Sequence, residues 1–260
     1  MGFEKRTVLP GVTHIRDELG VCMTLLTGSR QALLVDTGYG TDDVFSYVRT
    51  LTALPLTVIL THGHHDHALG ARQFRRVLID VRDLPVYRLY TGAGQREKVL
   101  ASAGARGVRC PDDYLTAEYR DPEPLTESQM DLGGMTAVFR LTPGHTPGSV
   151  TVLVPERELL LTGDDWNPVT WLFFPEALGA REYRANIRAL QRERYRHVLC
   201  PHRFELFDRA VMDAFIDGLT DECLARAVPT PEGDEKGIRT LRASPAPDQT
   251  LVFAGDRYHI

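Results

Sequence analysis

The segment Thr61-His62-Gly63-His64-His65-Asp66-His67 directly follows the apolar run from Leu56 to Leu60. It sets three imidazoles and a carboxylate at the spacing H-x-H-x-D-H. Neutral imidazole and carboxylate are the ligand types that hold zinc and similar divalent ions. The alternative, a solvated polar turn, is disfavoured because strong ligands rarely cluster in a turn directly after an apolar strand. The segment therefore predicts a metal site.

Length and charge restrict the class of protein. A chain of 260 residues with 43% hydrophobic residues can bury a sizeable core, and this length is compatible with one large layered domain. The net charge is -5, and acidic and basic residues are interspersed along most of the chain. No nucleic-acid-binding face is expected from this pattern, so a small-molecule partner is favoured.

The cysteines and the apolar runs bear on location. The four cysteines stand far apart with no C-x-x-C spacing, which argues against zinc ribbons and redox motifs. Residues 1–12 lack an apolar signal-peptide core, and no run reaches the ~18 apolar residues of a membrane span. We therefore expect a cytoplasmic protein with free thiols and no membrane partner. The cysteines are Cys22, Cys110, Cys200 and Cys223.

Short apolar runs that end in a potential metal ligand recur along the chain. Pro and Gly mark the segment 143–148 as a tight loop between two strands, and this loop contains a histidine. Two further apolar runs, 159–163 and 198–201, are each followed directly by another residue of a metal-ligand type. Continuous apolar runs fit strands buried on both faces, which requires layers that cover the sheet. The ligand candidates at these ends are His62, His145, Asp164 and His202.

Helices are available to form those layers. Apolar residues recur at helical spacing in 41–53, where Thr41 is the expected N-cap, and in 181–196 and 208–227. Segments 84–90 and 95–103 are candidates for short helices. The remaining expected strands are a meander over 12–35 and a C-terminal hairpin that pairs 238–242 with 250–253.

The ordered set His62-x-His64-x-Asp66-His67, Thr142-Pro143-Gly144-His145-Thr146-Pro147-Gly148, Gly163-Asp164 and His202 resembles the metallo-β-lactamase superfamily, and glyoxalase II-like hydrolases are the nearest branch. The resemblance spans residues 10–225. It implies an α+β fold, a four-layer αββα sandwich with two mixed sheets face to face and a dinuclear site at the rim. We expect one domain over 1–260, with an insert at about 82–130 and a C-terminal hairpin extension at about 236–260.

The resemblance also implies the ligand assignment. His62, His64 and His145 would hold one metal, and Asp66, His67 and His202 the second, with Asp164 bridging the two. Two divalent ions ~3.5 to 4 Å apart can share a water and lower its pKa, which gives a metal-bridging hydroxide as nucleophile. Asp66 and Asp164 are the expected catalytic residues because they would handle the proton. Two zinc ions are expected. Because all the ligands are nitrogen or oxygen and none is a thiolate, the site is less selective for zinc, and iron or manganese fits as well.

Residues around the ligands carry further expectations. Asp36 matches a family position that supports a ligand histidine, and the alternative is an aspartate that caps a turn. The loop 165–175 holds both tryptophans and is expected to form a substrate wall, the alternative being that its aromatics pack under the sheet rim. The insert is expected to form a lid or a homodimer contact. The wall residues are Trp166, Asn167, Trp171 and Phe173.

The leading hypothesis for function is a dinuclear metal-dependent hydrolase that cleaves a small-molecule thioester, ester or lactone. The alternative is a mononuclear-iron oxidoreductase of the persulfide dioxygenase type, for which His67 and His202 would be dispensable. A metal-binding protein without catalysis is disfavoured because the whole ligand set is intact. The residues after His202 do not match a glutathione-binding helical domain, which argues against a hydroxyacylglutathione substrate.

Overall fold

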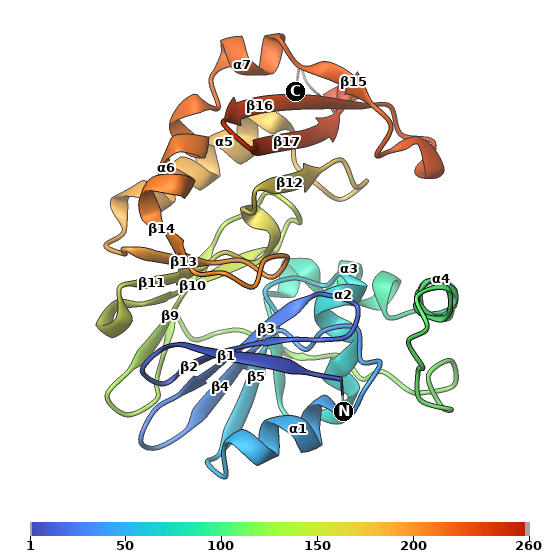
Figure 1. The fold of residues 1–260 in the computed structure, drawn as a ribbon, viewed down its shortest axis with the longest axis vertical. Helices are drawn as coiled ribbons and strands as arrows, with labels where there is room; N and C mark the ends of the chain where they lie inside the picture. Colours follow the sequence, from blue (N-terminus) through green and yellow to red (C-terminus); the bar gives the residue numbers. More distant parts are fainter. Residues whose placement is uncertain (1, 258–260) are drawn as a thin grey trace.

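Three β-sheets and their covering helices make up the protein, whose computed structural model describes residues 2–257 (Figure 1). The first sheet has its strands in sequential order. Its first part is the expected antiparallel meander, preceded by one more strand, and its last part pairs in parallel. The strands are β1 (Glu4–Leu9), β2 (Val12–Arg16), β3 (Cys22–Thr27), β4 (Ala32–Val35), β5 (Leu56–Ile59), β6 (Val77–Ile79) and β7 (Glu123–Pro124).

The second sheet has the strand order β14-β13-β11-β10-β9-β8. Its pairs are antiparallel except for β11 and β13, which are parallel. It is therefore a mixed sheet like the first. The strands are β8 (Gln129–Asp131), β9 (Thr136–Leu141), β10 (Val150–Val154), β11 (Leu159–Leu161), β13 (His197–Leu199) and β14 (Phe207–Asp208).

The C-terminal hairpin is part of a third sheet, which has the strand order β12-β17-β16-β15. The hairpin strand β17 also pairs in parallel with a strand from the middle of the chain, β12. The sequence pattern did not predict this pairing, because the two strands are about eighty residues apart. The strands are β12 (Val169–Leu172), β15 (Val228–Thr230), β16 (Thr240–Ala246) and β17 (Gln249–Ala254); residues 258–260 of the expected extension lie outside the described part.

The helices differ from the expected ranges where side chains cap the backbone. The first begins at Val44 and not at Thr41, since the Asp43 carboxylate accepts the Ser46 N–H at 2.9 Å. The expected helix 208–227 is broken in two, because Thr220 starts a second helix by accepting the Cys223 N–H at 3.1 Å. The helices are α1 (Val44–Leu51), α2 (His65–Ala68), α3 (Leu84–Tyr90), α4 (Ala93–Ala105), α5 (Ala180–Ala189), α6 (Arg209–Gly218) and α7 (Asp221–Ala225).

The central strands are buried on both faces, as their continuous apolar runs indicated. In β5, Ile59 faces the core between the first two sheets, whereas Val58 faces the helices outside. In β11, Leu161 faces the core between the sheets and Leu160 faces the opposite side. Alternation along a strand thus feeds two cores at once. The two inner faces of the sheets share one hydrophobic cluster, which confirms the face-to-face arrangement.

Helices cover the outer faces of both large sheets. Val44 and Val48 of α1, with Tyr87 of α3, pack on the first sheet. Ile187 of α5 and Phe215 of α6 pack on the second sheet, in a cluster that also takes in the third sheet. The predicted αββα sandwich is therefore confirmed, and Figure 1 shows the third sheet beside α5 and α6, toward the end of the molecule opposite α1. No helix between residues 2 and 257 combines the length and apolar character that crossing a membrane requires.

Candidate metal centre

Strand ends of both large sheets converge on one rim. In the second sheet, β9, β11 and β13 all run in the same direction, because β10 is antiparallel to both β9 and β11 and because β11 is parallel to β13. In the first sheet, β4 and β5 are parallel neighbours. Each of these five strands is followed within a few residues by a polar side chain directed to the rim. These side chains are Asp36, His62, His145, Asp164 and His202.

Strand register brings Asp164 and His202 together. Leu161 and Leu199 are partners in the parallel pair. Asp164 comes three residues after Leu161, and His202 comes three residues after Leu199. As a result, His202 Nε2 lies 3.0 Å from Asp164 Oδ1. Gly163 allows this turn, since its φ is +53° and a Cβ there would lie 2.9 Å from the Cβ of Thr61.

The segment 62–67 supplies ligands to two separate points. His62 and His64 precede α2, and His64 has extended backbone with φ -67° and ψ 153°. Asp66 and His67 lie in the first turn of that short helix. The change from extended to helical backbone turns the second pair of side chains away from the first. Residues of this one short segment can therefore face two different ions.

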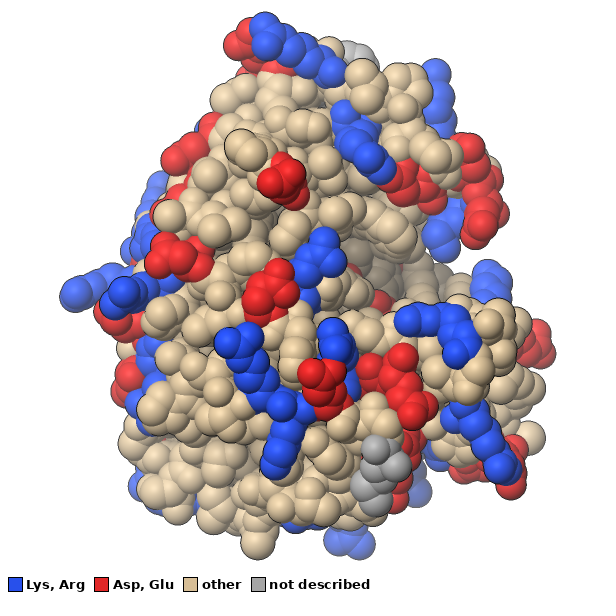
Figure 2. All heavy atoms as spheres, viewed as in Figure 1, with Lys and Arg blue, Asp and Glu red and all other residues tan. Residues whose placement is uncertain are grey.

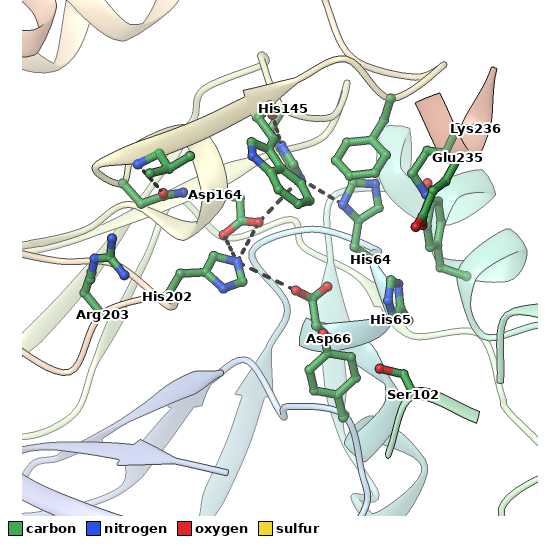
Figure 3. Close-up of a pocket in the computed structure, with 16 residues that line it drawn as sticks. His64, His65, Asp66, Ser102, His145, Asp164, His202, Arg203, Glu235 and Lys236 are labelled. Carbon is green, nitrogen blue, oxygen red and sulfur yellow. Dashed lines mark hydrogen bonds and ion pairs between the residues drawn. The ribbon is translucent and has the colours of Figure 1, made fainter. Parts of the chain in front are cut away.

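The donor atoms form two groups, each with all its ligand atoms within 4.8 Å of one another. The members are His62, His64 and His145 in the first group, and Asp66, His67, Asp164 and His202 in the second. His145 Nε2 lies 3.5 Å from Asp164 Oδ2, and His67 Nε2 lies 3.5 Å from Asp164 Oδ1. The Asp164 carboxylate thus faces both groups, as Figure 3 shows for the His145 and His202 sides.

Asp36 holds His67 from behind. His67 Nδ1 lies 2.9 Å from Asp36 Oδ2, and Asp36 Oδ1 accepts the Thr61 backbone N–H at 2.7 Å. A carboxylate only accepts at neutral pH, so His67 carries a proton on Nδ1, and its Nε2, which faces the site, would give its lone pair to a metal ion in place of a proton. This contact agrees with the supporting position assigned to Asp36 from the resemblance.

Two other candidate ligand histidines are held through contacts that sequence reasoning missed. His64 Nε2 lies 2.6 Å from Glu176 Oε1, and His145 Nδ1 donates to the Trp171 carbonyl at 2.6 Å. Their remaining nitrogens, His64 Nδ1 and His145 Nε2, are 2.8 Å apart. Glu176 follows the predicted wall loop and has no spacing relation to the histidine motif. No signal in the sequence could have identified it.

The buried donor atoms fit divalent metal ions. Within residues 2–257, no hydrogen-bond partner is present for His62 Nε2 or His67 Nε2, although both side chains are buried. An orphaned buried donor or acceptor is costly, and coordination to a cation would satisfy both nitrogens. The donor set of imidazole and carboxylate is also the set that zinc, iron and manganese accept. The residues present therefore fit two ions.

The electrostatics of the two groups differ. Burial lowers the pKa of His64 to about 4 and, together with the neighbouring imidazoles, holds the pKa of His62 well below its usual value. These rings are neutral and offer lone pairs. Burial also disfavours a charged His67, but Asp66 and Asp164 outweigh it and raise the pKa of His67 well above its usual value. The second group thus favours positive charge at the point its donors share.

Two buried carboxylates hold the loop of His145 in place. Asp83 accepts the Gly148 N–H at 2.9 Å and also the Gly63 N–H, which ties this loop to the segment 62–67. Asp165 accepts the His145 N–H at 3.1 Å and the Thr142 hydroxyl at 2.7 Å. Burial raises the pKa of Asp165 to about 8. Both carboxylates act on the backbone that carries the ligand, and neither belongs to the donor groups.

A pocket of about 600 Å³ opens above the metal centre. From the predicted wall loop, Asn167 and Trp171 line it, and Val169 and Phe174 do so as well. Trp166 and Phe173 are fully buried in the core cluster beside the third sheet and are not among the lining residues. The loop therefore combines both interpretations given above, with some residues in the wall and others in the core.

Residues of the segment 82–130, the expected insert, form the opposite side of the pocket. Tyr90 of α3 and Ser102 of α4 line it, and His65 stacks on Tyr90 with ring centroids 5.6 Å apart. Lys236 and Glu235 contribute from beside the third sheet. Figure 2 shows the hollow between these two parts, with acidic and basic residues interspersed over the visible face.

Comparison with known proteins places the chain in a family. Residues 16–165 match the family model described as the metallo-beta-lactamase superfamily. The chain belongs to this superfamily. The matched residues include the segment 62–67, His145 and Asp164. His202 and the whole third sheet lie beyond them.

Superfamily relatives of known name are similar over parts of their length. The probable metallo-hydrolase YqgX of Bacillus subtilis is 32% identical over 144 residues, which are 54% of this chain and 63% of that protein. The acyl-coenzyme A thioesterase MBLAC2 of Gallus gallus is 24% identical over 213 residues, or 75% of this chain and 70% of that protein. The chain thus spans less than two thirds of the first of these relatives.

Solved structures agree with the fold. A metallo-beta-lactamase from Pontibacter korlensis has a TM-score of 0.60 at 17% identity and covers 84% of this chain and 99% of its own. The inverting sec-alkylsulfatase Pisa1 from Pseudomonas sp. has a TM-score of 0.64 at 16% identity and covers 84% of this chain and 41% of its own. At these identities, the likeness extends to the fold alone.

Proposed function

We propose that the chain is a dinuclear metal-dependent hydrolase acting on a small-molecule thioester, ester or lactone. One observation carries the proposal: two donor groups, buried except for the half-buried His202, share the Asp164 carboxylate at the base of a single pocket. His62, His64 and His145 would hold the first ion, and Asp66, His67 and His202 the second, with Asp164 between them. Zinc is the proposed metal, since each group contains at least two imidazoles.

Two divalent ions, when bound, would supply Lewis-acid polarisation and a lower pKa for water. The residues of the chain itself would bind the ions, orient the substrate and exclude solvent. Asp66 lines the pocket and lies 3.6 Å from His67 Nε2. Although burial opposes it, the imidazoles of His67, His65 and His202 lower the pKa of Asp66, so this carboxylate is ionised and suited to bind a cation. We assign the proton-handling role to Asp66 and Asp164.

The proposed substrate class rests on the pocket walls and on one relative. Tyr90, Trp171 and Phe174 give the pocket an aromatic lining suited to an apolar acyl group. The similarity to an acyl-coenzyme A thioesterase supports a thioester within the three classes. We further propose that residues 1–260 act as one domain in which the insert, 82–130, forms one wall of the pocket. A homodimer contact and a cytoplasmic location stay predictions from the sequence.

The test combines metal analysis with a substrate panel. Protein loaded with zinc is expected to hold about two ions per chain by elemental mass spectrometry. It should hydrolyse members of a panel of thioesters, esters and lactones, and lose that activity on chelation and in His64→Ala. One iron per chain with oxygen uptake on a persulfide would instead favour the mononuclear oxidoreductase. Fewer than two ions, or activity that survives both treatments, would refute the proposal.

A further inference from the structure

Two ligands of the first group are held by one short segment, Trp171–Glu176. The segment contacts the outer nitrogen of His64 through a side chain and the outer nitrogen of His145 through a backbone carbonyl. It carries Trp171 and Phe174 of the pocket wall as well. The second group has a different support, Asp36, which lies on the opposite sheet. The two groups are therefore held by separate parts of the fold.

The contacts of His64 determine which of its nitrogens is free to bind metal. Glu176 Oε1 lies 2.6 Å from Nε2, and a carboxylate accepts but does not donate, so the proton is on Nε2. The Nδ1 lone pair then points toward the position that His145 Nε2 also faces, 2.8 Å away. The rings of Tyr90 and Phe174, with centroids at 4.3 Å and 4.8 Å, restrict rotation of the imidazole.

His145 is fixed in the complementary way. The Trp171 carbonyl can only accept, so His145 carries its proton on Nδ1 and leaves Nε2 free. His64 thus offers Nδ1 and His145 offers Nε2, and both lone pairs meet at one point. The segment that makes both contacts selects these opposite tautomers.

The position of this segment depends on the third sheet. Trp171 and Leu172 pair with Val252 and Phe253 of β17, and Phe173 is fully buried in the adjoining core. Glu176 lies just after this anchored stretch, with its side chain largely covered at 13% exposure. The C-terminal hairpin, which lies outside the residues matched by the family model, therefore fixes the distance from Glu176 to His64.

We propose that Glu176 is a positioning residue for the first metal, which it controls by holding His64 in the tautomer with a free Nδ1. The inference rests on the proposed dinuclear function. Asp36 has the equivalent role toward His67 in the second group, so the two carboxylates act on different ions. Removing such an outer carboxylate typically weakens metal affinity by about 10- to 100-fold.

The test counts ions in variants of the full chain loaded with zinc. Native mass spectrometry and titration against a chelating indicator would compare wild type, Glu176→Ala, Glu176→Gln, Asp36→Asn and the double variant Glu176→Ala/Asp36→Asn. Glu182→Gln, which removes an exposed carboxylate on α5, is the matched control. We expect Glu176→Ala to weaken one ion by about 10- to 100-fold and leave the other unchanged. Glu176→Gln should lose less, because its amide oxygen still accepts from Nε2.

The double variant shows whether the two carboxylates act on different ions. If they do, the chain should bind both ions more weakly than wild type. If both carboxylates act on the same ion, the other ion should keep its wild-type affinity, which would overturn the inference. Nitrogen-15 NMR of the zinc-loaded chain gives an independent readout, with His64 coordinated through Nδ1 in wild type and this signal lost in Glu176→Ala. Two ions at wild-type affinity in Glu176→Ala would also overturn it. A wild type with fewer than two ions would refute the dinuclear function itself, and this inference with it.

Discussion

At the residue scale, the chemistry of the site depends on which nitrogen of each histidine is free. The spacing of residues 62–67 supplies imidazoles but says nothing of their tautomers. Asp36, Glu176 and the Trp171 carbonyl settle the tautomers of His67, His64 and His145. None of these three contacts is local in sequence, so each is a property of the folded chain.

Substitution of Asp36 should separate its electrostatic role from its backbone role. Asp36 has φ +64°, a conformation that asparagine tolerates and alanine does not adopt without strain. Asp36→Asn is therefore expected to fold but to bind the second ion about 10- to 100-fold more weakly, since one acceptor is lost. Asp36→Ala should also lower the free energy of unfolding of the metal-free chain. Chelator competition and urea unfolding measure the two effects, and equal metal affinity in Asp36→Asn and wild type would contradict the first.

His14 should make stability sensitive to acid. Burial lowers the pKa of His14 from 6.5 to about 4, against hydrogen bonds that oppose it. The unfolded chain therefore binds this proton below about pH 6.5 while the folded chain does not, so stability falls as the pH drops from about 6.5 to 4, by about 3 kcal/mol for this group. Above pH 6.5 the group contributes no pH dependence.

The measurement compares urea unfolding of wild type and His14→Gln at pH 7.5 and pH 5. His14→Gln loses the contacts of the imidazole with Thr24 and the Arg203 carbonyl, so it is expected to be the less stable protein at pH 7.5. The difference between the two proteins should shrink at pH 5, because protonation of His14 stabilises the unfolded state of wild type only. A difference that stays constant between the two pH values would show that His14 does not titrate as expected.

At the element scale, the loop after Asp164 serves two purposes within a few residues. Trp166 is fully buried and its indole N–H donates to Gln249 at 3.2 Å, whereas Trp171 is 40% exposed in the pocket wall. Strand β12, paired with β17, exposes Val169 and Trp171 and buries Thr170 and Leu172 on its other side, whereas Trp166 precedes the strand and packs in the core cluster. The aromatic composition of the loop could not reveal which residue takes which place.

The two tryptophans should therefore respond differently to alanine substitution. Trp166→Ala leaves a large cavity and an unpaired Gln249 Oε1, and is expected to cost about 3–5 kcal/mol of unfolding free energy. Trp171→Ala should leave stability within about 1 kcal/mol of wild type but raise KM about tenfold, through the loss of apolar contact with substrate. Thermal unfolding and steady-state kinetics provide the comparison. An unchanged KM and substrate profile in Trp171→Ala would remove Trp171 from the substrate wall.

At the scale of the whole molecule, the candidate metal centre lies between the two large sheets. The first sheet supplies His62, His64, Asp66 and His67, and the second supplies His145, Asp164 and His202. Ions bound between them would link the two halves of the sandwich and favour the folded state by mass action. The neutral imidazoles of the first group and the carboxylates of the second both contribute to this link.

Metal removal is expected to destabilise the whole chain. At a free zinc concentration about a thousand times the dissociation constant, binding raises the free energy of unfolding by about 4 kcal/mol. For a chain of this size, this corresponds to an increase of about 8 to 16 °C in Tm. Chelation should remove this increment, and zinc should restore it. His64→Ala, as the matched variant, should recover only part of it, because one donor group is incomplete. Equal Tm values with and without metal in wild type would contradict the prediction.

The order of residues alone was enough to predict the candidate donor set and the superfamily, because ligand types at fixed spacing after apolar strands are local features. It also predicted the meander, the layers and the C-terminal hairpin from periodicity. Only the tertiary structure decided the pairing of β12 with β17, the place of each wall aromatic and the contact of Glu176 with His64. These depend on residues that are far apart in sequence, and close approach across sheets leaves no periodic signal in the chain.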